Sequence, residues 1–91
     1  MLLLQLSKQF TDDISSLRKE DKKLLSKVWE LIIDIQNNPK NPLSGLGKPE
    51  ALKQNMSGYY SRRITDKHRL VYKIVDGVLL LVSCYGHYDD K

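Results

Sequence analysis

The dipeptide Asp76-Gly77 constrains the fold of this 91-residue chain most strongly, because it separates two apolar runs that alternate as strands do. Two-residue turns of this composition join neighbouring antiparallel strands, since both positions accept the positive φ angles that a tight hairpin needs. The pattern therefore predicts strands over residues 69–75 and 78–85. The expected facing pairs across the hairpin are Val75 with Val78, Tyr72 with Leu81, and Arg69 with Cys84.

Alternation within the hairpin predicts one apolar face and one cationic face of a sheet. Arg69 and Lys73 belong to the cationic face, which we expect to be open. The apolar face is assigned to the helices, because a strand side that carries only apolar residues must be covered. Its members are Leu70, Tyr72, Ile74, Leu79 and Leu81.

A further strand is predicted over residues 59–65, ahead of the hairpin. A three-residue loop after it would pair Arg63 with Arg69 and direct both guanidinium groups into the open face, whereas a two-residue loop would separate them. Simple alternation places His87 on the helix-covered face. A role for His87 on the open face therefore requires a bulge or turn near the strand end, which Gly86 can supply.

Two amphipathic helices are predicted in the first half of the chain. Residues 2–6 favour a short buried strand, and Ser7 can then cap a first helix. A second helix begins near Asp21 and ends before Pro39, which cannot continue it. The apolar stripes are Phe10, Ile14 and Leu17 in the first helix, and Leu24, Leu25, Val28, Leu31, Ile32 and Ile35 in the second. The order β-α-α-β-β-β predicts an α+β fold, with two N-terminal helices packed on an antiparallel β-sheet.

Length and composition predict a single soluble domain over residues 1–91. The chain is 41% hydrophobic and 29% charged, as folded proteins are. One cysteine, Cys84, excludes an internal disulfide framework and a multi-cysteine zinc site, and it fits a reducing cytoplasm. The apolar start is too short for a signal sequence, and no run approaches the roughly 18 residues of a membrane span. We therefore expect a cytoplasmic protein with no membrane partner.

Positive charge is concentrated in the middle of the chain. The net charge is +4, and residues 48–73 hold seven lysines and arginines against two acids, Glu50 and Asp66. Within residues 57–72, three arginines, one histidine and three tyrosines exceed what a core needs. Such a basic and aromatic surface attracts nucleic acid, acidic proteins and anionic membranes alike. The composition therefore indicates a polyanion site without naming its ligand.

Four side chains in and after this segment are candidates for acid–base chemistry or phosphate binding. Glu50 is either a salt-bridged structural acid or a general base. His87, whose ordinary pKa is near neutral, suits proton donation and equally suits a solvated surface position. Arg63 and Arg69 lie in predicted strands, where each guanidinium needs a carboxylate or a phosphate, and nearby acids are too few. Arg62 faces the other way and is expected to be solvated or to contact a partner.

Other residues, and motifs that the sequence lacks, limit the kinds of reaction that the chain can be expected to catalyse. Tyr85 and Tyr88, at the end of the last predicted strand, can stack on unpaired RNA bases. His68 lies in a predicted turn and is expected to be structural or exposed. The chain has no phosphate-cradling glycine loop, no nucleophile elbow and no metal-ligand spacing among His68, Cys84 and His87. These patterns favour acid–base chemistry without a metal or another cofactor.

Four motifs resemble those of the YoeB (Txe) family of bacterial toxins, within the wider RelE/ParE superfamily. They are GKPE at 47–50, SRRI at 61–64, HRLVY at 68–72 and C-x-x-HY at 84–88. The resemblance implies a microbial-RNase-like (RelE-like) fold and a ribosome-dependent endoribonuclease that cuts messenger RNA in the decoding (A) site. It also implies inhibition by a cognate, acidic antitoxin of the YefM/Phd type, and it is compatible with a homodimer.

Carried over by motif, the resemblance implies that Glu50 is the general base, His87 the general acid and Arg69 the main phosphate-binding cation. The implied supporting contacts to RNA and phosphate are Lys53, Arg63 and Tyr88. The sequence departs from the family at Tyr85-Gly86, where the family usually has Arg-Tyr. This departure affects one cationic contact and the rigidity of the loop that carries His87.

RNA brings its own nucleophile, the ribose 2′-hydroxyl, so such an enzyme needs a base, an acid and positive charge for the crowded phosphorane. Two other functions remain open. ParE-like members of the superfamily poison DNA gyrase, and they generally lack the glutamate and the C-terminal His-Tyr pair. A non-catalytic basic binding module is the second alternative, which a separation of Glu50 and His87 above about 10 Å would favour.

Overall fold

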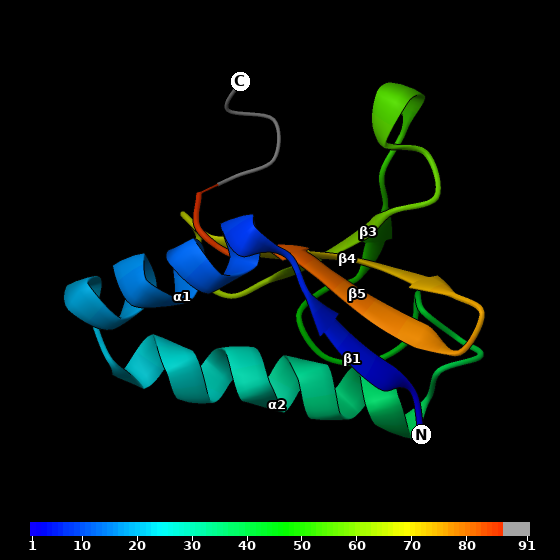
Figure 1. The fold of residues 1–91 in the computed structure, drawn as a ribbon, viewed down its shortest axis with the longest axis horizontal. Helices are drawn as coiled ribbons and strands as arrows, with labels where there is room; N and C mark the ends of the chain where they lie inside the picture. Colours follow the sequence, from blue (N-terminus) through cyan, green and yellow to red (C-terminus); the bar gives the residue numbers. More distant parts are fainter. Residues whose placement is uncertain (87–91) are drawn as a thin grey trace.

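The computed structural model describes residues 1–86, in which two helices pack against one face of a five-stranded sheet (Figure 1). The predicted α+β class and β-α-α-β-β-β order are confirmed, with one short strand added ahead of the last three. The helices are α1 (Lys8–Glu20) and α2 (Lys23–Asn37), and the 3₁₀ turn η1 (Gln54–Met56) projects on the side of the sheet away from α2. The strands are β1 (Leu3–Leu6), β2 (Glu50–Ala51), β3 (Tyr60–Arg63), β4 (Arg69–Val75) and β5 (Val78–Ser83), in the spatial order β1-β5-β4-β3-β2.

Strand β1 lies at one edge of the sheet and runs parallel to β5, so the sheet is mixed and not antiparallel throughout as predicted. Parallel neighbours cannot be joined by a tight turn, and here almost the whole chain separates them. The expectation that residues 2–6 form a buried strand is also wrong, because Leu3 is 72% exposed and Leu4 and Leu6 are exposed as well. An edge strand has no neighbour on its outer side, so its side chains are covered on one flank only.

The β4–β5 hairpin turns at Asp76-Gly77, as predicted. Both residues have positive φ angles, 51° for Asp76 and 78° for Gly77, which is the backbone geometry that this dipeptide favours in tight hairpins. The apolar side of the hairpin faces the helices, which confirms the predicted assignment of faces. The predicted facing pairs that occur are Val75 with Val78 and Tyr72 with Leu81.

The register of the hairpin then shifts, because Val71 pairs with Ser83 and one residue of β5 is bulged. The predicted pairing of Arg69 with Cys84 is therefore wrong. The Arg69 amide instead donates to the Gly86 carbonyl at 3.1 Å. A role for His87 on the open face requires an irregularity near the end of this strand, and the bulge in β5 is one. The face on which His87 lies stays a prediction.

The apolar face of the sheet and the inner faces of both helices form one core. Ser7 caps α1, since its Oγ atom accepts the Phe10 amide at 3.0 Å, and the Asp21 carboxylate accepts the Lys23 amide at 3.0 Å where α2 begins. Burial raises the pKa of the Cys84 thiol to about 12, which keeps this core thiol protonated. The buried members of the core are Phe10, Leu17, Val28, Leu31, Ile32, Ile35, Ile64, Leu70, Tyr72, Leu79, Leu81 and Cys84. No helix in residues 1–86 is long and apolar enough to cross a membrane.

Arg62 is completely buried, which contradicts the expectation that it is solvated or contacts a partner. Its Nη1 atom donates to Asp34 Oδ2 at 2.6 Å, and its Nε atom donates to the Tyr72 hydroxyl at 3.0 Å. A guanidinium has five donors in one plane, so it can also satisfy the carbonyls of an irregular loop. The loop carbonyls that accept from Arg62 are those of Pro42 (3.4 Å), Ser44 (2.9 Å) and Leu46 (3.1 Å).

The loop around Arg62 leads directly into β2, and its path is tightly constrained. A β-carbon on Gly45 would overlap Asp34 Oδ2, and the φ angle of Gly45, 116°, is one that residues with side chains rarely adopt. The Arg63 amide donates to the Gly47 carbonyl at 2.6 Å and so attaches the loop to β3. The loop that leads into β2 is therefore held by the Arg62 side chain and by the Arg63 amide.

Arg62→Met is expected to lower the free energy of unfolding by about 3–5 kcal/mol, because it removes the buried donor that Asp34, Tyr72 and the loop carbonyls share. Arg63→Met is the matched control. The Arg63 side chain is 44% exposed and its ion pair with Asp66 spans 3.6 Å, so its loss should change stability by less than about 0.5 kcal/mol. Urea unfolding at pH 7 measures both variants. Equal losses in the two would contradict the structural role of Arg62.

Candidate active site

The candidate site lies on the face of the sheet opposite the helices, where β2, β3 and β4 meet. Across these strands Glu50 pairs with Ser61, and Ser61 pairs with Val71. Two residues further along β3, Arg63 pairs with Arg69, which is the predicted alternative that directs both guanidinium groups into the open face. Residues paired in this way place their side chains on the same side of a sheet. The topology therefore brings one carboxylate, one hydroxyl and two guanidinium groups together.

Arg69 is held deep in this face, with its side chain only 8% exposed. Its Nε atom donates to Ser61 Oγ at 3.0 Å, and its Nη2 atom lies 3.7 Å from Glu50 Oε1. Nη2 is shielded from water, yet it donates no hydrogen bond to any residue in the described part of the chain. A charged donor in that state is costly, and an anionic oxygen would relieve it. The geometry fits a phosphate-binding arginine.

Glu50 stands at the rim of the site, in the two-residue strand β2, with its side chain 48% exposed. Its 3.7 Å separation from Arg69 Nη2 exceeds the roughly 2.7–2.9 Å of a charge-assisted hydrogen bond, so the two groups attract each other without a direct bond. A carboxylate so placed can reach a substrate proton while the neighbouring cation binds phosphate. Glu50 therefore suits both roles that the sequence left open, a salt-bridged acid and a general base.

The two supporting cations, Arg63 and Lys53, are more exposed than Arg69. Arg63 shares the face of Arg69, but its Nη1 atom lies 3.6 Å from the exposed Asp66 carboxylate. Lys53 immediately precedes η1, the turn that projects beyond this face (Figure 1). Exposed cations of this kind attract a polyanion through long-range charge and do not fix its geometry.

The two remaining candidates, His87 and Tyr88, lie outside the described residues. Their roles and the separation of Glu50 from His87 therefore stay predictions. The chain is described as far as Gly86, whose carbonyl accepts the Arg69 amide at 3.1 Å. The residue immediately before His87 is thus hydrogen-bonded to the strand that carries the candidate phosphate-binding arginine.

Three buried polar residues near the site were not assigned to it from the sequence. Ser61, the partner of Arg69, is completely buried, and strand alternation places it on the same face as Arg63. Asp13 is 5% exposed within the otherwise apolar stripe of α1, where a carboxylate is unusual. His68 is 3% exposed, so of the two expectations for it the structural one is confirmed.

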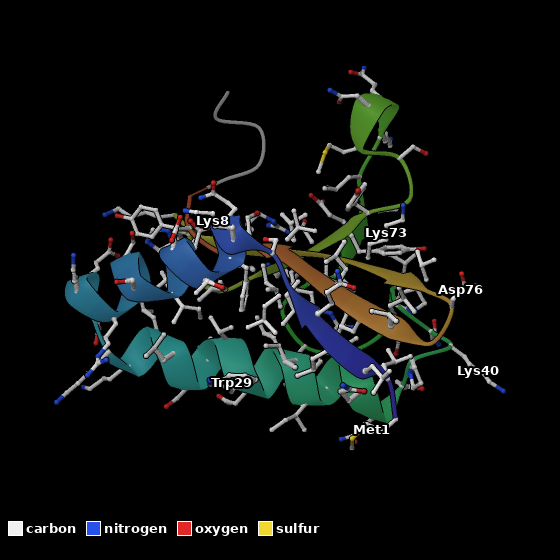
Figure 2. All side chains as sticks on the ribbon, in the orientation of Figure 1. Met1, Lys8, Trp29, Lys40, Lys73 and Asp76 are labelled. Carbon is white, nitrogen blue, oxygen red and sulfur yellow. The ribbon has the colours of Figure 1, made fainter. Side chains whose placement is uncertain are left out.

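A cavity of ≈ 310 Å³ extends the same face toward the β4–β5 turn. Lys73 projects there, on the side of the sheet away from α2 (Figure 2), and its Nζ atom lies 4.9 Å from the centre of the Tyr59 ring. Gln5 and Leu80 also line this cavity. In residues 1–86, no three histidine, cysteine, aspartate or glutamate side chains gather as a metal site would require.

Comparison with known proteins assigns the family. The family model described as the YoeB-like toxin of bacterial type II toxin–antitoxin systems matches residues 6–88. The chain belongs to this family. Toxin YoeB of Escherichia coli (strain K12) is 45% identical to it over 82 residues, which cover 90% of this chain and 94% of that relative.

Solved structures of YoeB proteins have the same fold as this YoeB-like chain. The YoeB dimer from Staphylococcus aureus matches with a TM-score of 0.84 and 44% identity, over 96% of this chain and 98% of that one. The YoeB–YefM complex from Staphylococcus aureus matches with a TM-score of 0.83 and 42% identity, over 97% and 99% of the two chains. The resemblance read from the four motifs is confirmed for family and fold.

Inorganic sulfate is expected to raise the melting temperature of this YoeB-like chain, because an anion would satisfy Arg69 Nη2. At about 100 times its dissociation constant, sulfate would add about 2.7 kcal/mol. Arg69→Gln should abolish the effect, whereas Arg18→Gln, at an exposed arginine in the last turn of α1, should retain it. Thermal unfolding in sulfate and in chloride at equal ionic strength measures the difference. The same rise in all three proteins would indicate a general salt effect and no site at Arg69.

Proposed function

We propose that this YoeB-like chain is the toxin of a toxin–antitoxin pair and cleaves messenger RNA in the decoding (A) site of the ribosome. One observation carries the proposal. Arg69 is a nearly buried guanidinium whose Nη2 atom donates to no residue among 1–86, and it lies 3.7 Å from the half-exposed carboxylate of Glu50. A phosphate-binding cation beside a candidate base is the arrangement that RNA transesterification needs.

The proposed reaction uses the nucleophile that RNA supplies. Glu50 takes the proton of a ribose 2′-hydroxyl, and the 2′-oxygen forms a bond to the adjacent phosphorus. The bond from phosphorus to the 5′-oxygen of the next nucleotide breaks, and His87 donates a proton to that oxygen. The products are a 2′,3′-cyclic phosphate and a 5′-hydroxyl, so the cleavage step consumes no water.

Arg69 stabilises the negative charge that develops on the phosphorane. The hydrogen bond to Ser61 orients the guanidinium in advance, so Nη2 can meet a phosphate oxygen with little reorganisation. Low exposure strengthens this interaction, because little water competes for the charge. In the proposed complex, the exposed cations Lys53 and Arg63 hold flanking phosphates and Tyr88 stacks on a base.

The ribosome supplies the positioning that an open site lacks. Glu50 is half exposed, so a free RNA strand would approach it in many orientations. Correct orientation of reacting groups is worth about 7–11 kcal/mol in favourable cases. A message held in the decoding site presents one 2′-hydroxyl in a fixed orientation. In this division of roles the ribosome aligns the substrate, while the toxin contributes the base, the acid and the positive charge.

An acidic antitoxin of the YefM type is the proposed inhibitor, and the YoeB–YefM complex from Staphylococcus aureus supports this partner. Lys53, Arg63 and Lys73 give the sheet face opposite the helices a positive charge. A partly disordered acidic segment can cover such a face by folding upon binding. The YoeB dimer from the same organism supports a homodimer for this chain.

The ribose of the message is expected to act as the nucleophile. A message with a single 2′-deoxy sugar at the cleavage site should bind the programmed ribosome and the toxin but remain uncut. The unmodified message should give a first product that ends in a 2′,3′-cyclic phosphate, and Glu50→Gln should lower the rate constant about 10²–10⁴-fold. Single-turnover kinetics and mass spectrometry of the product measure these outcomes. Cleavage of the deoxy message at an ordinary rate would exclude the mechanism.

Charge reversal on the open face is expected to weaken binding of the acidic antitoxin. The double variant Arg63→Glu and Lys73→Glu should raise the dissociation constant by about tenfold or more, mainly at low salt. The matched control is Lys23→Glu with Lys40→Glu, because both lysines are exposed, Lys23 at the start of α2 and Lys40 in the loop that follows α2. Titration calorimetry at two salt concentrations measures the effect. Equal affinities of the two double variants would place the interface elsewhere.

A further inference from the structure

Two buried side chains hold three successive backbone amides at the end of the described chain. Asp13 Oδ2 accepts the Cys84 amide at 2.9 Å and the Tyr85 amide at 3.3 Å. His68 Nδ1 accepts the Gly86 amide at 2.9 Å. Strand β5 ends at Ser83, so these hydrogen bonds hold the backbone of the three residues that follow the last strand. Neither acceptor has a part in the proposed chemistry.

The hydrogen bond to Gly86 determines the tautomer of His68. Because the Gly86 amide is the donor, Nδ1 must be unprotonated, and the proton of the neutral ring is on Nε2. That Nε2–H group then donates to Glu20 Oε2 at 2.9 Å. The hydrogen bond from His68 lowers the pKa of Glu20, so the carboxylate is ionised at neutral pH. Glu20 therefore orients His68 with its acceptor nitrogen directed at Gly86.

Tyr85 contacts both His68 and Glu20. Its ring stacks on His68 with the centroids 4.5 Å apart, and its hydroxyl donates to Glu20 Oε1 at 3.3 Å. The negative charge of Glu20 raises the pKa of Tyr85, so this hydroxyl keeps its proton. The imidazole is thus fixed by a carboxylate, an aromatic face and a backbone amide at once.

Gly86 needs such restraint, because glycine is the residue whose backbone is freest to rotate. Its φ angle is 81°, and a β-carbon there would meet nothing within 4 Å, so side-chain packing does not fix it. Its amide is bound by His68 and its carbonyl by the Arg69 amide at 3.1 Å. Both polar groups of this peptide segment are therefore fixed, and the residue that follows in the chain is His87.

We propose that His68, oriented by Glu20, and Asp13 are positioning residues for the general acid, because they fix the point beside Arg69 from which the chain continues into His87. The inference rests on the proposed function, since it assumes that His87 protonates the leaving oxygen. Misplacing a reacting group by about 1 Å can cost about a hundredfold in rate. Loss of the Gly86 anchor should therefore reduce catalysis without removing any catalytic side chain.

Two substitutions separate the two hydrogen bonds of His68. His68→Asn keeps an acceptor near the position of Nδ1 for the Gly86 amide and loses the donor to Glu20. His68→Gln can keep a donor near Glu20 and loses the acceptor for Gly86. Both remove the ring that stacks on Tyr85, so each is the control for the other. We expect cleavage by His68→Asn to stay within about tenfold of wild type, and His68→Gln to lose about a hundredfold in kcat with little change in KM.

A substrate with sulfur in place of the leaving 5′-oxygen tests whether the lost rate belongs to the acid, because a thiolate leaves without needing a proton. The loss in His68→Gln should shrink to about tenfold or less on this substrate, as the loss in His87→Gln should. The loss in Glu50→Gln should persist. Glu20→Ala, at a surface position that the fold tolerates more easily, should give a smaller loss with the same dependence on the leaving group.

The experiment compares single-turnover cleavage of both substrates on programmed ribosomes, together with hydrogen exchange of the Gly86 amide in the free protein. Faster exchange in His68→Gln than in His68→Asn, with a rate loss that depends on the leaving group, would support the positioning role. Equal cleavage by the two variants, or equal losses on both substrates, would overturn that role while the proposed function stands. Absence of cleavage by the wild-type protein would overturn the proposed function and this role with it.

Discussion

The burial of one guanidinium, that of Arg62, holds the structure around its candidate site. Arg62 donates to Asp34 in α2, to Tyr72 in β4 and to three carbonyls of the loop between α2 and β2. Burial alone would raise the pKa of Asp34, but hydrogen bonds from the Leu46 amide and from Arg62 hold it below its ordinary value. The carboxylate is therefore ionised at neutral pH and neutralises the guanidinium. Because the same loop leads into β2, the position of Glu50 depends on a polar cluster inside the core.

Buried polar side chains also hold the chain on the C-terminal side of the site. Asp13 and His68 are buried polar groups, and each is satisfied by backbone amides of residues 84–86. A buried polar group is tolerable only when it is hydrogen-bonded, so these residues stabilise the fold only with the chain in this position. Arg69 lies between the two anchored segments, on β4 itself. The rigid sheet thus carries the phosphate-binding candidate, while two buried polar clusters attach the segments that flank it.

Local patterns in the sequence were sufficient to predict the hairpin and both helices, and they gave the pairing of Arg63 with Arg69 as one of two alternatives. Each depends on residues that are close together in the chain, where turn chemistry and periodicity operate. The parallel edge strand, the bulge in β5 and the burial of Arg62 depend on contacts between distant segments. Alternation correctly placed Arg62 and Arg63 on opposite faces of the sheet. It could not show that carbonyls of the loop before β2 accept hydrogen bonds from Arg62 on the helix side. Motifs therefore marked the candidate residues, whereas the buried residues that support them were not predicted.

The arginines and lysines of residues 48–73 occupy three different environments, although each contributes one positive charge to the net charge. Arg62 faces the core and adds nothing to the open surface, so the charge available to a partner is smaller than the composition indicates. Lys53, Arg63 and Lys73 remain accessible enough to attract a polyanion, and salt screens attraction of that kind. Arg69 is nearly buried, its Nε atom donates to Ser61 Oγ, and its Nη2 atom lies 3.7 Å from Glu50 Oε1. Under the proposed function, an acidic antitoxin therefore competes with RNA for the exposed cations without reproducing the contact at Arg69 on which the proposed chemistry depends.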